Sequence, residues 1–244
     1  MGMPASSWYA RVRKWIVRLA VAVVLLLPLV MVGVWLGIQH IPEWYRPPVI
    51  SPQDYQKVRD DFEAIFNEMS RGLISSREPF KLVLSDEQVN NWMAVRGEIL
   101  PEASAWVPDY LDDPMIRFEE DLITVGGTVS RGNVRSVVSL GWRVKVRPEI
   151  VTLRLEKTRS GSLPVPETAI AELLSKMAGD PATAGASLSQ DGMRLAGAIR
   201  QAGTGLEIEN LFRWSNGDRL FRITSIESKD GSMRLGIQPL NQNR

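Results

Sequence analysis

The feature that most constrains this chain is an uncharged apolar stretch that runs from Leu19 to Ile38. A helix of about 20 such residues is long enough to cross the ~30 Å hydrocarbon core of a bilayer. Four basic residues precede the stretch, and the first acidic residue, Glu43, follows it. Because positive charge stays on the cytoplasmic side of a membrane, this asymmetry predicts an internal N-terminus and an external C-terminal domain.

The pattern divides the chain into a basic N-terminus at 1–15, a transmembrane helix at 16–38, a proline-rich linker at 39–50 and an exported domain at 51–244. A cleaved signal peptide, a lipoprotein and a buried core helix are the alternatives. A signal peptide needs a shorter apolar region and small residues at a cleavage site. A lipoprotein needs a cysteine, which the chain lacks, and a buried core helix leaves the one-sided basic flank without a reason. We therefore expect a single-pass protein of the inner membrane.

The amino-acid composition of the exported domain indicates which class of protein it belongs to. The chain has no cysteine, so this domain must fold on its core alone, without disulfides. About 200 residues are enough for one domain with a sizeable core. All 28 acidic residues lie beyond the apolar stretch, and a mildly acidic domain has no bulk electrostatic reason to bind nucleic acid. Together with the absence of Asn-x-Ser/Thr glycosylation sites, these properties are typical of bacterial envelope proteins.

Three helices are expected in the exported domain. Apolar residues recur at steps of three and four over 53–73, with acidic residues between them, which predicts an amphipathic helix. The sequence Ser85-Asp86-Glu87-Gln88 is a capping box that opens a helix at 86–95. Pro166-Glu167 opens a further helix at 167–178, and the stretch that follows, 179–205, is rich in Gly, Ala and Ser.

The strands are expected to form one sheet. Apolar and polar residues alternate over 138–146 and again over 151–155, which predicts an antiparallel hairpin with one buried face. Residues 100–115 are rich in proline and aspartate and should be irregular. The predicted class is α+β, with a curved antiparallel sheet packed on helices. Further strands are expected at 116–118, 123–129, 206–214, 219–226 and 232–239.

The absence of certain residues excludes several chemistries. The single histidine, His40, lies in the linker, and there is no cysteine. Nucleophilic sites of the serine–histidine or cysteine–histidine type and zinc sites therefore cannot form in the exported domain. No phosphate-binding or dinucleotide-binding motif occurs. We therefore expect that this protein binds no cofactor and no metal and that it is not an enzyme. A carboxylate-dependent glycan hydrolase remains as an alternative, with Asp112, Asp113, Glu119 and Glu120 as the clustered candidates.

Two short patterns suggest contact sites. Arg143, Lys145 and Arg147 form a basic stripe on one face of a predicted strand. This stripe could hold an anionic headgroup, or it could be the solvated face of a half-buried sheet. Gly33 and Gly37 form a Gly-x-x-x-Gly pattern that can bring two apolar helices into close contact. The oligomeric state stays open.

Three segments carry a resemblance to a known group of proteins. They are residues 80–92, where a strand enters a capped helix, residues 160–166, where a strand ends in two prolines, and the turn sequences at 216–217 and 229–232. They resemble the YpmS-like group of bacterial single-span proteins and, more loosely, YceB-type and tubular lipid-binding (TULIP-like) domains. The resemblance implies a curved antiparallel sheet wrapped on a long helix, with an apolar groove in some members. It implies no active-site residues.

The function that these observations predict is non-catalytic binding of a lipid or another amphipathic envelope ligand. The lipid bilayer is the expected partner of residues 16–38. An assembly or scaffold subunit that meets another envelope protein is the alternative, and exposed apolar patches would mark it. The candidate aromatics of a ligand groove are Trp92, Trp106, Trp142 and Trp214. Ordinary core packing would account for these tryptophans equally well.

Overall fold

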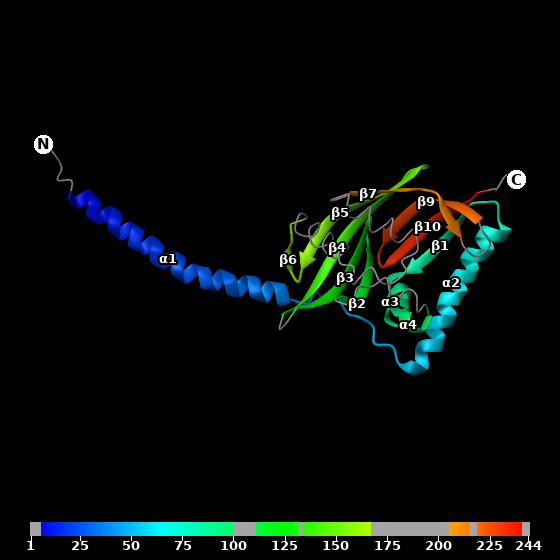
Figure 1. Ribbon diagram of the computed structural model, residues 1–244, viewed down its shortest axis with the longest axis horizontal. Helices are drawn as coiled ribbons and strands as arrows, with labels where there is room; N and C mark the ends of the chain where they lie inside the picture. The colour runs from blue at the N-terminus through cyan, green and yellow to red at the C-terminus, as the bar shows by residue number, and fades with distance from the viewer. Residues whose placement is uncertain (1–5, 100–110, 132–133, 167–204, 215–218, 241–244) are drawn as a thin grey trace, which may run out of the picture.

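The computed structural model describes residues 6–99, 111–131, 134–166, 205–214 and 219–240. Helix α1 (Ser6–Gln39) extends away from one end of a body made of strands, and helix α2 (Tyr55–Ser75) lies at the opposite end (Figure 1). The linker between them runs along the body. The predicted helix at 167–178 and the stretch at 179–205 lie outside the described residues, apart from Gly205.

The strands form two antiparallel sheets rather than one. Sheet A contains four strands in the order β1-β10-β9-β8. Sheet B contains β2-β3-β4-β5-β6, and β7 pairs with β5. The strands of sheet A are β1 (Phe80–Ser85), β8 (Phe212–Trp214), β9 (Arg219–Lys229) and β10 (Ser232–Pro239). Those of sheet B are β2 (Leu111–Glu119), β3 (Leu122–Arg131), β4 (Val134–Val146), β5 (Ile150–Ser160), β6 (Leu163–Pro164) and β7 (Gly205–Glu209).

This architecture shows that the predicted fold class, a transmembrane helix followed by one curved sheet packed on helices, is wrong. The structure is mostly sheet, with 46% strand against 35% helix. One reason is that the strands are long, since β4 alone has 13 residues. Another is that residues 111–115, expected to be irregular, pair with β3 as part of β2. Across the described residues, no helix combines the length and the apolar character needed to cross a membrane.

The short helices begin where local chemistry satisfies their first amide groups. Ser51 accepts a hydrogen bond from Gln53 at the start of the 3₁₀ helix η1 (Pro52–Asp54), which leads into α2. Ser85 and Gln88 form the predicted capping box of helix α3 (Asp86–Ala94), and this prediction is confirmed. A single turn, α4 (Arg96–Ile99), follows.

Each sheet has its own apolar core. In sheet A, Leu73 of α2 packs with Leu82, Phe221 and Ile237, which come from three strands. In sheet B the cover comes from the linker, because Tyr45 packs with Met115 and Val137 and is flanked by Trp44. Burial of such side chains is the main favourable term in folding, so the linker acts as a structural part of sheet B rather than as a free tether.

The two sheets meet through hydrogen bonds between turns. The amide of Asp121, in the β2–β3 turn, donates to the carbonyl of Ser228 (3.0 Å), and the amide of Gly231 donates to Phe118 (2.9 Å). Asp121, Asp230 and Gly231 all have positive φ, the backbone conformation that tight turns need and that Gly and Asp tolerate better than bulky residues. Each of the β2–β3 and β9–β10 turns is therefore hydrogen-bonded to the other hairpin, which holds the two sheets together.

Two buried asparagines fix elements near this junction, one between helix α3 and β2 and the other between the two sheets. The side chain of Asn90, on α3, exchanges two hydrogen bonds with the backbone of Ile116 in β2, at 2.7 and 2.8 Å. The side chain of Asn210 bonds to both backbone groups of Ile223 and to the carbonyl of Arg147, each at 2.8 Å. A buried side-chain amide with its partners in place fixes the elements around it.

Candidate functional site

The base of α1 is attached directly to sheet B. The carbonyl of Gly37 accepts hydrogen bonds from the backbone amide and the hydroxyl of Ser162, at 3.0 and 3.2 Å. The carbonyl of Ile38 accepts a hydrogen bond of 2.8 Å from the hydroxyl of Ser136. These carbonyls come from the last turn of α1, where no intrahelical donor remains. Gly161 (φ +60°) lies so close that a Cβ there would be 2.2 Å from the Gly37 oxygen.

Tyr45 anchors the linker a few residues further on. Its hydroxyl lies 2.7 Å from the carbonyl oxygen of Asp113 and 3.0 Å from the hydroxyl of Thr128, which is also buried. Burial raises the pKa of Tyr45 above its usual value of 10.0, because the charged phenolate would lose its hydration. The neighbouring Trp44 lies over Gly126, where a Cβ would come within 2.7 Å of the indole ring.

Between the linker and sheet B lies a cavity of about 530 Å³, which we call the linker cavity. Its apolar walls come from Ile41, Val49 and Val137, together with two prolines of the linker. Ile41 and Val49 are exposed at its edge. Its polar lining residues are Gln39, Tyr45, Asp113, Thr128, Arg135 and Ser136.

The linker cavity has one basic and one acidic lining residue, Arg135 and Asp113, which form an exposed ion pair. The guanidinium of Arg135 lies 3.6 Å from the carboxylate of Asp113, and both side chains are largely exposed. Exposed ion pairs of this kind contribute little to stability. Arg135 can therefore exchange this partner for an anionic group of a ligand at small cost.

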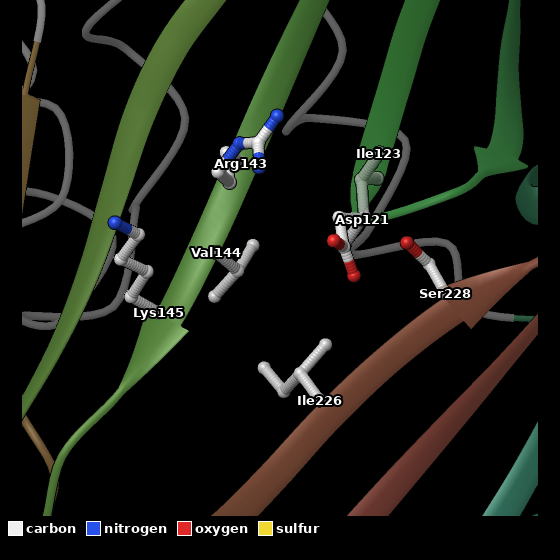
Figure 2. Close-up of a pocket in the computed structure, with 7 residues that line it drawn as sticks. All are labelled: Asp121, Ile123, Arg143, Val144, Lys145, Ile226 and Ser228. Carbon is white, nitrogen blue, oxygen red and sulfur yellow. The ribbon is translucent and has the colours of Figure 1, made fainter.

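A second, smaller cavity of about 190 Å³ lies between β4 and β9, which we call the seam pocket. Figure 2 shows Val144 and Ile226 between the two strands, with Lys145 on β4 and Ser228 on β9. Asp121, from the β2–β3 turn, and Ile123, from β3, complete the lining together with Arg143.

Two of the three residues of the predicted basic stripe, Arg143 and Lys145, line the seam pocket. Arg143 is already paired, because its guanidinium lies 2.7 and 2.9 Å from the carboxylate of Glu156. This hydrogen bond lowers the pKa of Glu156 and raises the pKa of Arg143. The third residue, Arg147, does not line the pocket and offers its backbone carbonyl to Asn210. Lys145 is thus the basic group that the pocket presents to solvent.

The predicted groove aromatics lie in separate places. Trp92 packs edge to face on Phe62 of α2, with ring centroids 5.4 Å apart, and its indole donates to Asp61. Trp214 lies 4.8 Å from Phe66, also on α2. Trp142 is half-buried in β4, opposite Ile123, and Trp106 lies outside the described residues. None of the three described tryptophans lines the linker cavity or the seam pocket.

The predicted pair of close-packed glycines also falls into two environments. Gly37 faces Leu163 of β6, whose side chain would lie 2.8 Å from an added Cβ. Gly33 has nothing within 4 Å of that position. Gly37 is therefore already in contact with this chain's own sheet.

The acidic candidates do not converge on one point. Asp112 and Asp113 lie near the start of β2, whereas Glu119 is its last residue. At about 3.3 Å per residue, the two groups are on the order of 20 Å apart, well beyond the ~5–9.5 Å that separates the paired carboxylates of glycosidases. Across the described ranges, no three acidic or histidine side chains gather where they could hold a metal ion.

The residues that sequence reasoning missed are those that build the linker cavity. Tyr45 and Arg135 are separated by 90 positions, and nothing in the local pattern of either indicates the other. The only available signal was the proline content of 39–50, which predicted an extended linker but not the sheet it would cover. Comparisons with protein-family models, with curated proteins and with solved structures found no match to this chain.

Proposed function

We propose that this chain is a non-catalytic module that binds an amphipathic ligand of the lipid class in the linker cavity. The observation that carries the proposal is the cavity itself. Its volume of about 530 Å³ lies within the ~300–1,000 Å³ typical of ligand sites, whose linings combine apolar walls with a few polar groups. The resemblance to the YpmS-like group is in keeping with this proposal and remains a hypothesis.

The lining suggests how such a ligand would lie. Its apolar part would contact Ile41 and Val49 of the linker and Val137 of β4. Its polar end would reach Arg135, the basic residue of the lining, whose ion pair with Asp113 is exposed. The hydroxyl of Tyr45 is already engaged with Asp113 and Thr128, so it shapes the floor of the cavity rather than recognising the ligand.

Exposed apolar side chains lie at the edge of the cavity and along the helix that precedes it. Val49, at the edge, is 98% exposed, and the exposed side chains of α1 include Leu25, Leu29 and Met31. Contiguous exposed apolar side chains mark surfaces that contact a lipid phase or another protein. We therefore place the module at the extracytoplasmic face of a bacterial inner membrane, as a part of the same proposal.

Native mass spectrometry of the detergent-purified full chain, followed by organic extraction, tests the ligand class. The variant Val49→Glu adds a carboxylate at the apolar edge of the cavity without disturbing the core, because Val49 is exposed. We expect the amount of bound lipid to fall about tenfold or more, which corresponds to about 1.4 kcal/mol. The matched control is Val83→Glu in β1, where the side chain is 51% exposed and does not line the cavity.

Retention of lipid by the parent and the control, with loss in Val49→Glu, supports the proposal. A parent chain that carries no lipid, or equal retention in all three proteins, overturns it. A second candidate function, a scaffold subunit of an envelope complex, is favoured by the same exposed apolar side chains on α1. Recovery of one protein partner by crosslinking, with no lipid bound, would favour that alternative.

A further inference from the structure

The linker cavity presents two charged side chains of opposite sign, Arg135 from β4 and Asp113 from β2. The guanidinium nitrogen lies 3.6 Å from the carboxylate oxygen, which is beyond the ~2.7–2.9 Å of a charge-assisted hydrogen bond. Across the part of the chain that the structure describes, no hydrogen bond occupies either charged group. The two side chains are 69% and 53% exposed. Both can therefore contact a ligand without first breaking a hydrogen bond.

The hydroxyl groups of the lining are not available in this way. Those of Tyr45, Thr128 and Ser136 already take part in hydrogen bonds within the chain. These bonds hold the linker against sheet B. Arg135 and Asp113, the charged residues of the lining, therefore decide which charges a ligand can carry.

The backbone of Asp113 is held in an uncommon conformation. Its φ of +50° lies in the left-handed region, which residues other than glycine seldom adopt. The carbonyl of Asp113 accepts a hydrogen bond of 2.7 Å from the hydroxyl of Tyr45, and the strand register shifts between Asp112 and Met115. Residues held by their surroundings in such conformations cluster at ligand-binding positions. The contacts that shape the floor of the cavity thus also fix the backbone that carries this carboxylate.

We infer that the ligand of the linker cavity has a zwitterionic headgroup, with a phosphate beside a primary ammonium, as in phosphatidylethanolamine; this inference rests on the proposed function, the binding of a lipid. The phosphate would accept hydrogen bonds from the guanidinium of Arg135. The ammonium would donate to the carboxylate of Asp113. The short ethylene bridge of ethanolamine keeps the two ends close enough to contact both side chains.

Other headgroups match this pair of charges less well. A headgroup whose only charge is a phosphate would take Arg135 away from Asp113 and leave that carboxylate beside a second anion. A trimethylammonium group has no N–H to donate, and proteins recognise it on the faces of aromatic rings. The aromatic residue of the lining, Tyr45, is buried. Phosphatidylglycerol and phosphatidylcholine should therefore bind more weakly than phosphatidylethanolamine.

Native mass spectrometry of the full chain, delipidated in detergent, tests the headgroup assignment by competition. The probes are dioleoyl phosphatidylethanolamine, dioleoyl phosphatidylglycerol and dioleoyl phosphatidylcholine at equal concentrations, so that only the headgroup differs. We expect about fivefold more bound phosphatidylethanolamine than either of the others, which is the upper range for one exposed ion pair.

Two variants identify the residues that recognise the headgroup. Asp113→Asn removes the charge but tolerates the positive φ, so the preference over phosphatidylglycerol should disappear. Asp112→Asn, which lies outside the lining, should keep that preference. Arg135→Gln should weaken the binding of all three lipids, because each carries a phosphate. Arg159→Gln, exposed on β5 and outside the lining, is its control and should bind as the parent does.

The outcomes separate the headgroup assignment from the proposed function. Equal or stronger binding of phosphatidylglycerol or phosphatidylcholine by the parent overturns the headgroup assignment and leaves the proposed function standing. So does a preference that persists in Asp113→Asn, or unchanged binding by Arg135→Gln. A parent chain that binds none of the three lipids overturns both. If glycerophosphoethanolamine, the headgroup without acyl chains, displaces the lipid at equal concentration, the headgroup assignment stands and the lipid class of the ligand is wrong.

Discussion

At the scale of single residues, Asn210 joins the two sheets, because its side chain bonds to Ile223 of β9 and to Arg147, the residue that follows β4. It is 1% exposed, and its amide donates to Arg147 and Ile223 while its oxygen accepts from Ile223. Its own backbone amide donates to Glu149. A buried group with this many partners has no equivalent replacement among the natural side chains.

The variant Asn210→Asp keeps the size of the side chain but replaces its donor with a charged acceptor. The new carboxylate would face the carbonyls of Arg147 and Ile223. We expect a loss of about 3 kcal/mol or more in the free energy of unfolding, because a buried charge is left unpaired. Urea denaturation measures this loss, and Asn67→Asp on the exposed face of α2 is the control, with a change within about 0.5 kcal/mol. Equal midpoints for both variants would contradict the role given to Asn210.

Tyr45 makes the stability of the linker depend on pH. Because burial raises its pKa above 10.0 in the folded chain, the stabilisation that it provides is complete below pH 10.0 and is lost as the pH rises through the raised pKa. We expect the unfolding free energy of the parent to fall more steeply above pH 10.0 than that of Tyr45→Phe, which cannot ionise. Denaturation midpoints of both proteins across the alkaline range measure the difference. Parallel curves would show that Tyr45 ionises as freely as in the unfolded chain.

At the scale of elements, the sequence pattern predicted those helices, hairpins and turns that form from interactions between residues close together in the chain. Helices α2 and α3, the β4–β5 hairpin and the turn between β9 and β10 all form where periodicity and turn residues placed them. The start of β2 was missed because prolines and aspartates usually break strands. Here a register shift between Asp112 and Met115, at the edge of the sheet, accommodates Pro114.

The attachment of α1 to sheet B rests on the close approach of Gly161 to the last turn of the helix. Gly161→Ala would place a Cβ 2.2 Å from the Gly37 oxygen, at a φ of +60° that alanine rarely adopts. We expect the end of α1 to separate from Ser136 and Ser162 and the linker to loosen, which should speed chymotryptic cleavage after Tyr45, a residue that is buried in the parent chain. Gly33→Ala is the control, since nothing lies within 4 Å of it. Similar cleavage rates for both variants would show that the contact does not hold the helix.

At the scale of the whole molecule, the arrangement of the two sheets and the candidate site could not be predicted from the sequence. The linker cavity combines residues 39–49 with residues 113–137, and the seam pocket combines β4 with β9, which are about 80 positions apart. Periodicity reports whether a face is buried but not which element buries it. Arg143 and Lys145 could be placed on one face from strand alternation alone. Both line the seam pocket, and Lys145 is exposed there.

The same junction determines how the molecule unfolds. Sheet A and sheet B are joined by Asn210 and by the hydrogen bonds of the β2–β3 and β9–β10 turns. Because opening one sheet would leave these polar groups buried without partners, we expect both sheets to unfold in one cooperative step. Hydrogen exchange followed by mass spectrometry should therefore give the same opening free energy for peptides from β5 and β10. In Asn210→Asp the two values should separate, with one sheet opening before the other. Unequal values in the parent chain would show instead that each sheet is stable without the other.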